Sequence, residues 1–307
     1  MIYNANFIIT NKCNSRCRNC NIWANDKKND LNVNEINKLF SLNEFRNVTD
    51  LGLSGGEPFI RADLLECSEA IISSLKKLKT LFITTNGTFP QKTITFCTLY
   101  GKKGYNVNIG VSIDGTKKTN KKIRGIDSYD IACDLLSRLR TIPNTFPSIS
   151  FTICNENCTS ENILHVINLS KQLQCGLTFR IAEETDYYNN YGKLQKLSEE
   201  QMKLVIALFF KFRNSDKYMN AAYNFYKTGI NDLMFDYDKK RVICGAGKDF
   251  VFIQSNGDIY PCIYSKTIIG NLNGFLQIHN DYICEKCPCM TECSVWPVII
   301  RNEKYDK

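Results

Sequence analysis

Strand-like and helix-like segments alternate along the first 185 residues of the chain, and this alternation sharply limits the choice of fold. Short apolar runs are separated by segments whose apolar residues recur every three or four positions. The expected strands are 6–10, 48–54, 80–85, 107–113, 148–154 and 177–181, and the expected helices are 33–45, 62–75, 91–100, 129–139 and 161–173. Such alternation is typical of a parallel sheet covered by helices. We therefore expect an α/β fold, a partial (β/α)6 TIM-like barrel, in residues 1–185.

The sequence pattern changes after residue 185 and predicts two further regions. Ser198 and Gln201 form a capping-box pattern ahead of a periodic apolar segment, so we expect residues 186–243 to be a helical bridge. Beyond it, Asn256-Gly257 stands between two apolar runs, which predicts a β-hairpin. Residues 244–307 are therefore expected to form a small, cysteine-rich β-hairpin annex. Its tail, residues 282–295, is too short for a core of its own and is expected to need metal to fold.

The composition excludes several classes of protein. The 39 Lys and Arg residues exceed the 31 Asp and Glu residues by 8, and no nucleic-acid-binding motif accompanies this modest surplus, so we expect no nucleic-acid partner. No secretion signal is visible and no run of apolar residues is long enough to span a bilayer, so we expect a cytoplasmic protein with no membrane contact. In that setting, the 15 cysteines favour metal ligation over disulfides.

The first cysteine motif has a spacing typical of an iron–sulfur site. Cys13, Cys17 and Cys20 follow the first expected strand in a Cys-x3-Cys-x2-Cys arrangement with no fourth cysteine nearby. Three thiolates can hold three irons of a cubane and leave the fourth iron open to another ligand. A zinc knuckle is the alternative, although zinc normally takes four protein ligands and the two histidines, His165 and His279, are distant in sequence.

Four further motifs give the chain a specific resemblance to a known family. Each motif is a polar or glycine cluster at the end of an expected strand or just beyond it: Gly55-Gly56-Glu57-Pro58, Thr85-Asn86-Gly87, Ser112-Ile113-Asp114-Gly115 and Lys122-Ile123-Arg124-Gly125. Barrels of this kind place their sites at the carboxyl ends of the strands. Together with the cysteine loop, and in this order, the motifs resemble those of the radical S-adenosylmethionine (radical SAM) superfamily.

This resemblance implies a set of cofactors and a reaction. A [4Fe–4S] cluster on the catalytic Cys13, Cys17 and Cys20 would bind S-adenosylmethionine and cleave it reductively to a 5′-deoxyadenosyl radical, which abstracts hydrogen from a substrate. In the family, the motif glutamate and its adjacent backbone bind the amino group of the cofactor. The residues expected to bind the cofactor are Gly55, Gly56, Glu57, Pro58, Asn86, Ser112, Asp114, Trp23 and Arg180.

Some of these assignments have structural alternatives. Many members of the family carry an aromatic residue before the last loop cysteine, where this chain has Asn19, so Trp23 is expected either to stack on adenine or to belong to the core. Arg180 ends the sixth expected strand and either binds a carboxylate or is a solvated rim charge. His165 and six scattered cysteines are expected to be structural, with return of a hydrogen atom by one thiol as the alternative; the cysteines are Cys67, Cys97, Cys133, Cys154, Cys158 and Cys175.

The C-terminal cysteines resemble the auxiliary-cluster extension called SPASM, or its half-size relative, the twitch domain. The candidate metal ligands are Cys244, Cys262, Cys284, Cys287, Cys289 and Cys293. No cysteine follows Cys293, which leaves two full clusters short of ligands. We therefore expect one auxiliary iron–sulfur cluster, of the [4Fe–4S] type, on Cys244, Cys262 and two of the last four cysteines, with a structural zinc ion as the alternative.

Members of the family with such extensions act on two kinds of substrate. The segment 112–125 is most similar to that of peptide and protein maturases, so we expect a radical SAM enzyme of oxidoreductase or isomerase type that modifies a peptide, reduced by an electron donor such as flavodoxin or ferredoxin. The first strand begins at once, so we expect no N-terminal leader-peptide-binding domain. A dehydrogenase or epimerase acting on a sugar, aminocyclitol or nucleotide is the second possibility, and a non-catalytic metal-binding or electron-transfer module is the third.

Overall fold

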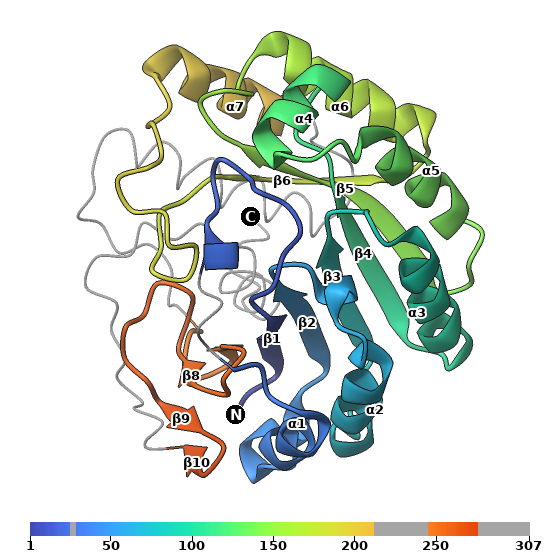
Figure 1. The fold of residues 1–307 in the computed structure, drawn as a ribbon, viewed down its shortest axis with the longest axis vertical. Coiled ribbons are helices and arrows are strands. Elements are labelled where there is room, and N and C mark those ends of the chain that lie inside the picture. The colour runs from blue at the N-terminus through green and yellow to red at the C-terminus, as the bar shows by residue number, and fades with distance from the viewer. Residues whose placement is uncertain (25–28, 212–244, 276–307) are drawn as a thin grey trace, which may run out of the picture.

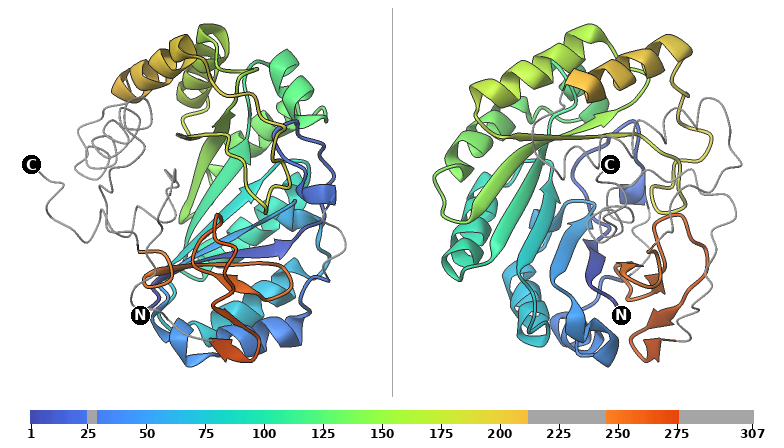
Figure 2. Two further views of the ribbon diagram at one scale, coloured as in Figure 1. Left: turned by 90° about the vertical axis from the view of Figure 1, so that its left-hand side faces the viewer. Right: turned by 180° about the vertical axis from the view of Figure 1, so that it is seen from behind.

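One mixed β-sheet organises the part of the chain that the structure describes. The computed structural model describes residues 1–24, 29–211 and 245–275. Its strand order is β10-β9-β8-β7-β1-β2-β3-β4-β5-β6, and β6 and β10 are edges, so the sheet is open and not a closed barrel. The curved sheet wraps partly around the cysteine loop, with the helices on its outer side (Figure 1; Figure 2).

Six parallel strands run in chain order through the N-terminal part. They are β1 (Asn4–Thr10), β2 (Asp50–Gly55), β3 (Thr80–Thr85), β4 (Asn106–Ser112), β5 (Thr145–Ile153) and β6 (Gly176–Ile181). Each of the six expected strands is therefore confirmed, with ends shifted by a few residues. The register pairs Ile8 with Ser54, and Thr84 with Gly110, which in turn pairs with Ser148.

The helices cover the outer face of this sheet and bury its alternate residues. They are α1 (Val33–Phe40), α2 (Leu64–Ser74), α3 (Pro90–Lys102), α4 (Lys117–Arg124), α5 (Tyr129–Leu139), α6 (Ser160–Gln172) and α7 (Glu199–Lys211). In β2, for example, Leu51 and Leu53 are almost fully buried, whereas the alternating Gly52 and Ser54 are only partly buried. Towards the carboxyl ends of β2, β3 and β4, the opposite face carries the small or polar residues Ser54, Thr84 and Ser112, which leave room for a ligand.

Two helices differ from the sequence-based expectation. The expected helix 33–45 ends at Phe40, and a 3-10 turn, η2 (Asn43–Asn47), follows it. Helix α4 was not expected, because five of its eight residues are cations and the segment carries almost no apolar periodicity. Its caps define it instead: the Thr116 side chain accepts a hydrogen bond from the Thr119 amide, and Gly125 ends the helix at φ +65°.

Residues 245–275 extend the same sheet. Strand β7 (Phe250–Ile253) pairs in parallel with β1, and β8 (Ile259–Tyr260), β9 (Gly270–Asn271) and β10 (Gly274–Phe275) follow as antiparallel strands. The expected hairpin around Asn256-Gly257 is confirmed, with Gly257 at φ +87° in the turn. The division into regions 1–185, 186–243 and 244–307 stays a prediction, because residues 212–244 and 276–307 lie outside the described part. No helix in the described ranges is both long and apolar enough to cross a membrane.

Candidate functional site

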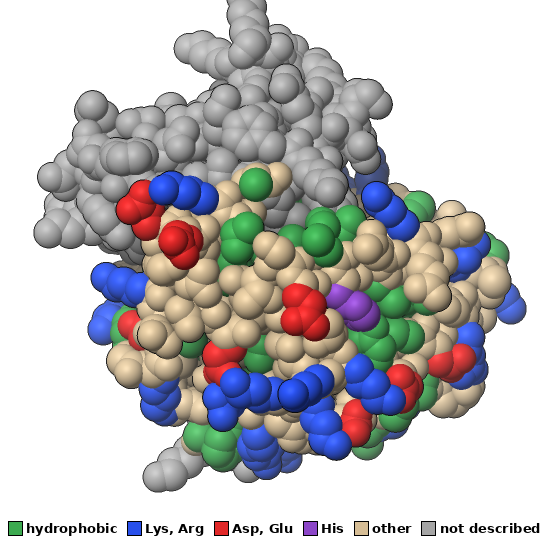
Figure 3. Space-filling view, turned by 90° about the horizontal axis from the view of Figure 1, so that it is seen from above, with side chains coloured by type: hydrophobic (Ala, Val, Ile, Leu, Met, Phe, Trp, Pro, Cys, Tyr) green, Lys and Arg blue, Asp and Glu red, His purple; other side chains and the backbone are tan. Residues whose placement is uncertain are grey.

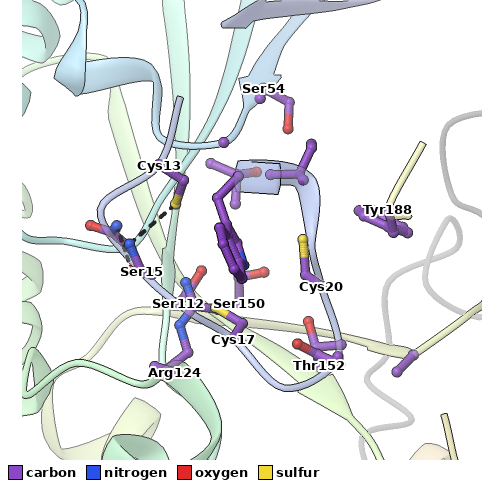
Figure 4. Close-up of a pocket in the computed structure, with 18 of the residues that line it drawn as sticks. Cys13, Ser15, Cys17, Cys20, Ser54, Ser112, Arg124, Ser150, Thr152 and Tyr188 are labelled. Carbon is purple, nitrogen blue, oxygen red and sulfur yellow. Dashed lines mark hydrogen bonds between the residues drawn. The ribbon is translucent and has the colours of Figure 1, made fainter. Parts of the chain in front are cut away.

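A pocket lies at the carboxyl ends of the parallel strands, and the three N-terminal cysteines line it. Cys13, Cys17 and Cys20 belong to the loop that follows β1, and Figure 4 shows their side chains around the pocket. Five neighbouring strands contribute small hydroxyl groups or a cation to the lining: Ser54, Thr84, Ser112, Ser150, Thr152 and Arg180. The pocket is therefore lined both by thiols and by hydrogen-bonding groups.

The cysteine loop is held in place by the carboxyl end of helix α4. The Arg16 amide donates to the Arg124 carbonyl at 3.1 Å, and the Arg18 amide donates to the Ile123 carbonyl at 2.8 Å. A Cβ atom on Gly125 would lie 2.6 Å from the Arg16 carbonyl oxygen, so glycine is needed for this close approach as well as for the left-handed turn. The motif from Lys122 to Gly125 thus forms the platform of the loop.

The glycine pair at the end of β2 permits a second close approach. A Cβ atom on Gly56 would lie 2.2 Å from the Lys12 carbonyl oxygen, and one on Gly55 would lie 2.2 Å from the Thr10 carbonyl oxygen. The Gly56 amide donates to Thr10 and the Glu57 amide donates to Lys12, both at 2.8 Å. Both glycines line the pocket, so bare backbone faces a ligand here.

Glu57, which was expected to bind the cofactor, is buried and does not itself line the pocket. Its side chain is 0% exposed, and neither Glu57 nor the buried Pro58 lines the pocket. Its carboxylate accepts hydrogen bonds from the Asn86 amide at 2.6 Å, the Thr85 hydroxyl at 2.8 Å and the Phe59 amide at 3.1 Å. Burial raises the pKa of Glu57, and these three donors oppose that rise.

Asn86 connects Glu57 to the cysteine loop. The Asn86 side-chain amide donates to Asn14 Oδ1 at 2.7 Å and to Ser15 Oγ at 2.9 Å, and Asn86 also lines the pocket as expected. The side chain of Glu57 therefore supports the loop through Asn86, and only the glycine backbone of its motif reaches the pocket. This role depends on a residue 29 positions away in sequence, so the motif alone did not reveal it.

Asp114 has a similar supporting position. It is 0% exposed and does not line the pocket, whereas Arg124, with which it pairs at 3.2 Å, does line it. The other carboxylate oxygen of Asp114 accepts a hydrogen bond from the Thr152 amide at 2.9 Å. Burial lowers the pKa of Arg124, but the nearby Cys17 and Asp114 outweigh it and raise the pKa, so the guanidinium stays charged beside the cysteine loop.

The three thiols form a donor set that suits a cluster. Burial raises the pKa of all three, to about 11 for Cys20, so bare thiolates are unfavourable in this pocket and a bound cation is needed to compensate their charge. In the described residues, no three Cys, His, Asp or Glu side chains converge closely enough to hold one metal ion. A cubane does not require such convergence, because each thiolate ligates a different iron.

Two further expected residues, Trp23 and Arg180, line the pocket. The Arg16 guanidinium lies 4.5 Å from the centre of the Trp23 ring, and within the described residues the buried Trp23 Nε1 has no hydrogen-bond partner. The Arg180 guanidinium lies 5.5 Å from the centre of the Tyr188 ring. The Nε atom of Arg124 is also buried without a hydrogen-bond partner. These two unsatisfied nitrogen atoms indicate that a polar ligand completes the site.

The segment after β6 was missed by the sequence-based reasoning. Glu183, Tyr187 and Tyr188 line the pocket, and the Tyr188 carbonyl accepts a hydrogen bond from the Asn21 amide at 2.8 Å. Burial raises the pKa of Glu183, and the nearby Tyr264 and Arg180 oppose that rise. The only available signal was position, since this segment directly follows the last strand of the expected barrel.

The remaining cysteines fall into two groups. Cys262 is 4% exposed and belongs to an apolar cluster against which Cys13 and Cys20 pack, whereas Cys244, Cys284, Cys287, Cys289 and Cys293 lie outside the described residues. None of the six scattered cysteines lines the pocket. His165 is hydrogen-bonded to the Tyr129 hydroxyl at 2.6 Å, away from the pocket, in keeping with its expected structural role.

Comparisons with known proteins place this site in context. Residues 7–149 match the model of the Radical SAM superfamily. The GTP 3′,8-cyclase of Campylobacter lari is 24% identical over 268 residues, which cover 83% of this chain and 78% of that protein. The mycofactocin maturase MftC of Mycolicibacterium smegmatis is 23% identical over 275 residues, which cover 86% of this chain and 66% of that protein.

The fold is shared with a solved structure, that of Streptococcus suis SuiB bound to the precursor peptide SuiA. The TM-score is 0.64 at 18% identity, and the match covers 90% of this chain. It covers 64% of the SuiB chain, so this chain spans less than two thirds of that protein. At this identity the likeness concerns the fold alone.

Proposed function

Because this chain belongs to the radical SAM superfamily, we propose that it is an enzyme that modifies a peptide or protein with a [4Fe–4S] cluster held by Cys13, Cys17 and Cys20. The observation that carries the proposal is that these three thiols line one pocket together with the Gly55–Gly56 backbone. When bound, the cluster and S-adenosylmethionine supply the chemistry that removes hydrogen from an unactivated C–H bond. The protein supplies binding, orientation and charge.

Each side of the pocket has a distinct task in this proposal. The thiolates ligate iron, and the charged Arg124 offsets part of their negative charge. The side-chain-free backbone of Gly55 and Gly56 lets the cofactor approach closely, and Ser112 and Arg180, which also line the pocket, offer hydrogen bonds to its polar groups. Trp23 offers an aromatic surface, and its free Nε1 offers a donor.

The charge of the pocket supports a peptide substrate over a nucleoside triphosphate. Among the described residues that line it, Arg124 and Arg180 are the cations, and Arg124 is paired with Asp114. Glu183 adds a carboxyl group to the same lining. A polyphosphate normally needs a cluster of cations, whereas hydroxyls and one arginine suit peptide groups. The sequence likeness to the mycofactocin maturase MftC supports the same choice.

One observation favours a second candidate, a small-molecule substrate. The similarity to the GTP 3′,8-cyclase of Campylobacter lari extends over 83% of this chain. The hydroxyl-rich wall of the pocket also suits a hydroxylated ligand such as a sugar or nucleoside. Incubation of the reconstituted enzyme with GTP and with candidate peptides, followed by mass spectrometry, separates the two substrate classes.

The C-terminal cysteines complete the proposal. We place one auxiliary iron–sulfur cluster on Cys244, Cys262 and two of Cys284, Cys287, Cys289 and Cys293. Cys262, the described member of this set, is buried in the cluster of side chains that also contacts Cys13 and Cys20, so the auxiliary site is expected close to the first one. A reduced flavodoxin or ferredoxin is the proposed electron donor.

The decisive experiment is anaerobic turnover of the reconstituted protein with S-adenosylmethionine and a chemical reductant. We expect 5′-deoxyadenosine and methionine as products and about eight irons per chain, four for each cubane. Replacing Cys13, Cys17 and Cys20 by alanine should abolish both the products and about half of the iron. Wild-type protein that binds iron but forms no 5′-deoxyadenosine would instead support a non-catalytic electron carrier.

A further inference from the structure

The outer side of the cysteine loop and helix α4 form one exposed basic surface. It consists of Arg16, Arg18, Lys118, Lys121 and Lys122, all exposed, and we call it the α4 basic face. We propose that it is the docking surface for an acidic one-electron carrier protein that reduces the cluster. This inference rests on the proposed function, because it needs a cluster at Cys13, Cys17 and Cys20.

The first argument is position. Cys17 lines the pocket, while its neighbours Arg16 and Arg18 are exposed, so the loop itself separates the cluster site from solvent here. The amides of both arginines are hydrogen-bonded to the end of α4, which places the α4 lysines beside the same stretch of loop. Because electron transfer slows steeply with distance, a carrier gains most by docking where so little protein covers the cluster.

The second argument is the charge of the surface. Helix α4 has five cations and no acid in eight residues. Two of its lysines, Lys117 and Lys118, lie in the first turn, where positive charge opposes the helix dipole and costs stability. Figure 3, which looks onto the end of the molecule that carries α4, α6 and α7, shows Lys and Arg side chains in a row along one edge. Because these α4 lysines lower the stability of the helix, we take their presence as a sign that the surface binds a partner.

Neighbouring acids neutralise this surface only in part. Lys121 pairs with Asp127 at 2.8 Å, Lys117 pairs with Asp130, and Glu156 is shared by Arg18 at 2.9 Å and Lys122 at 2.7 Å. With Lys117 included, six exposed cations face three acids, an excess of three positive charges. Exposed pairs of this kind contribute little stability, so an acidic partner can displace them readily. Complementary charge would then accelerate its association.

The test measures 5′-deoxyadenosine formation by the full-length reconstituted protein, without substrate, at increasing concentrations of reduced flavodoxin and at low salt. In Lys118→Glu/Lys121→Glu, we expect the apparent KM for flavodoxin to rise about tenfold, at the low end of the range for electrostatic steering. The difference should shrink in high salt. With photoreduced deazaflavin as a small reductant, the variant should match the wild type.

A matched control reverses two charges at the opposite end of the sheet. Lys76 and Lys79 are exposed in the connection between α2 and β3, at the amino ends of the strands, and Lys76→Glu/Lys79→Glu should keep the wild-type KM. An unchanged KM in the α4 variant, an equal rise in both variants, or a loss of activity with deazaflavin would each overturn the docking proposal. Failure of the wild type with deazaflavin would refute the proposed function instead, so the two failures are distinguishable.

Discussion

Replacing Glu57 with glutamine separates a supporting role of this side chain from direct cofactor binding. The carboxylate accepts three hydrogen bonds, two at Oε1 and one at Oε2, and it is 0% exposed. Glutamine has the same shape but only one acceptor oxygen. If that oxygen keeps the Oε1 position, the new amide group faces the Asn86 amide, and two donors meet where the wild type has a bond of 2.6 Å.

The expected loss of stability follows from this lost hydrogen bond and from the two donors that then face each other. Each buried donor left unsatisfied costs about 1–3 kcal/mol, so we expect Glu57→Gln to lower the free energy of unfolding of the cluster-free protein by about 2–4 kcal/mol. Because Asn86 also holds Asn14 and Ser15, the cysteine loop should loosen and the iron bound after reconstitution should fall.

The assay combines urea unfolding of the cluster-free protein with iron analysis and S-adenosylmethionine binding. Glu69→Gln is the control, because Glu69 is only partly buried on α2 and pairs with Lys103 at the surface, where loss of the pair costs less than about 1 kcal/mol. If Glu57→Gln retained wild-type stability and iron but lost affinity for S-adenosylmethionine, the carboxylate would be a cofactor ligand and the supporting role would be wrong.

Three further predictions concern the same site. Gly56→Ala should reduce bound iron, because the added Cβ atom would lie 2.2 Å from the backbone of the cysteine loop and such overpacking costs about 1–3 kcal/mol. In the control Gly104→Ala, the added Cβ atom would have no neighbour within 4 Å, but the backbone is strained at φ +89°. This control should therefore lose stability and keep its iron. Asp114→Asn breaks the buried pair with Arg124 and should lower the free energy of unfolding in urea by about 3 kcal/mol; a change under about 1 kcal/mol would contradict the pairing. Burial raises the pKa of the Cys20 thiol from 9.0 to about 11. The contribution of this thiol to the stability of the cluster-free protein is therefore complete below pH 9 and is lost as the pH rises toward 11. The free energy of unfolding measured at pH 8 and at pH 10 should show this loss, and Cys20→Ala should reduce it.

Local patterns were sufficient for much of the fold. The six strands and the hairpin at Asn256-Gly257 were predictable, because alternating burial and turn geometry depend on residues close together in the chain. Helix α4 escaped prediction because its apolar contact with the core is mainly Ile123, while its caps, Thr116 and Gly125, are weak signals by themselves.

The site could be predicted only in part, for the same physical reason. The spacing of Cys13, Cys17 and Cys20 and the glycines at the end of β2 indicated a cofactor pocket from the sequence, and the structure brings them to one place. The other features of the site depend on contacts between segments that are distant in sequence. Asn86, which is 29 residues away in sequence, donates its backbone amide to the Glu57 carboxylate. The segment after β6 supplies Glu183, Tyr187 and Tyr188 to a wall that no motif marks.

The chain by itself determined which segments become strands, helices and turns and which thiols can share a cluster, since these properties follow from neighbours a few residues apart. The tertiary structure alone decided which polar side chains face the pocket and which lie beneath it. A buried carboxylate must find donors wherever the fold places them, and the donors from Thr85 to Glu57 and from Thr152 to Asp114 come from 28 and 38 residues away in sequence.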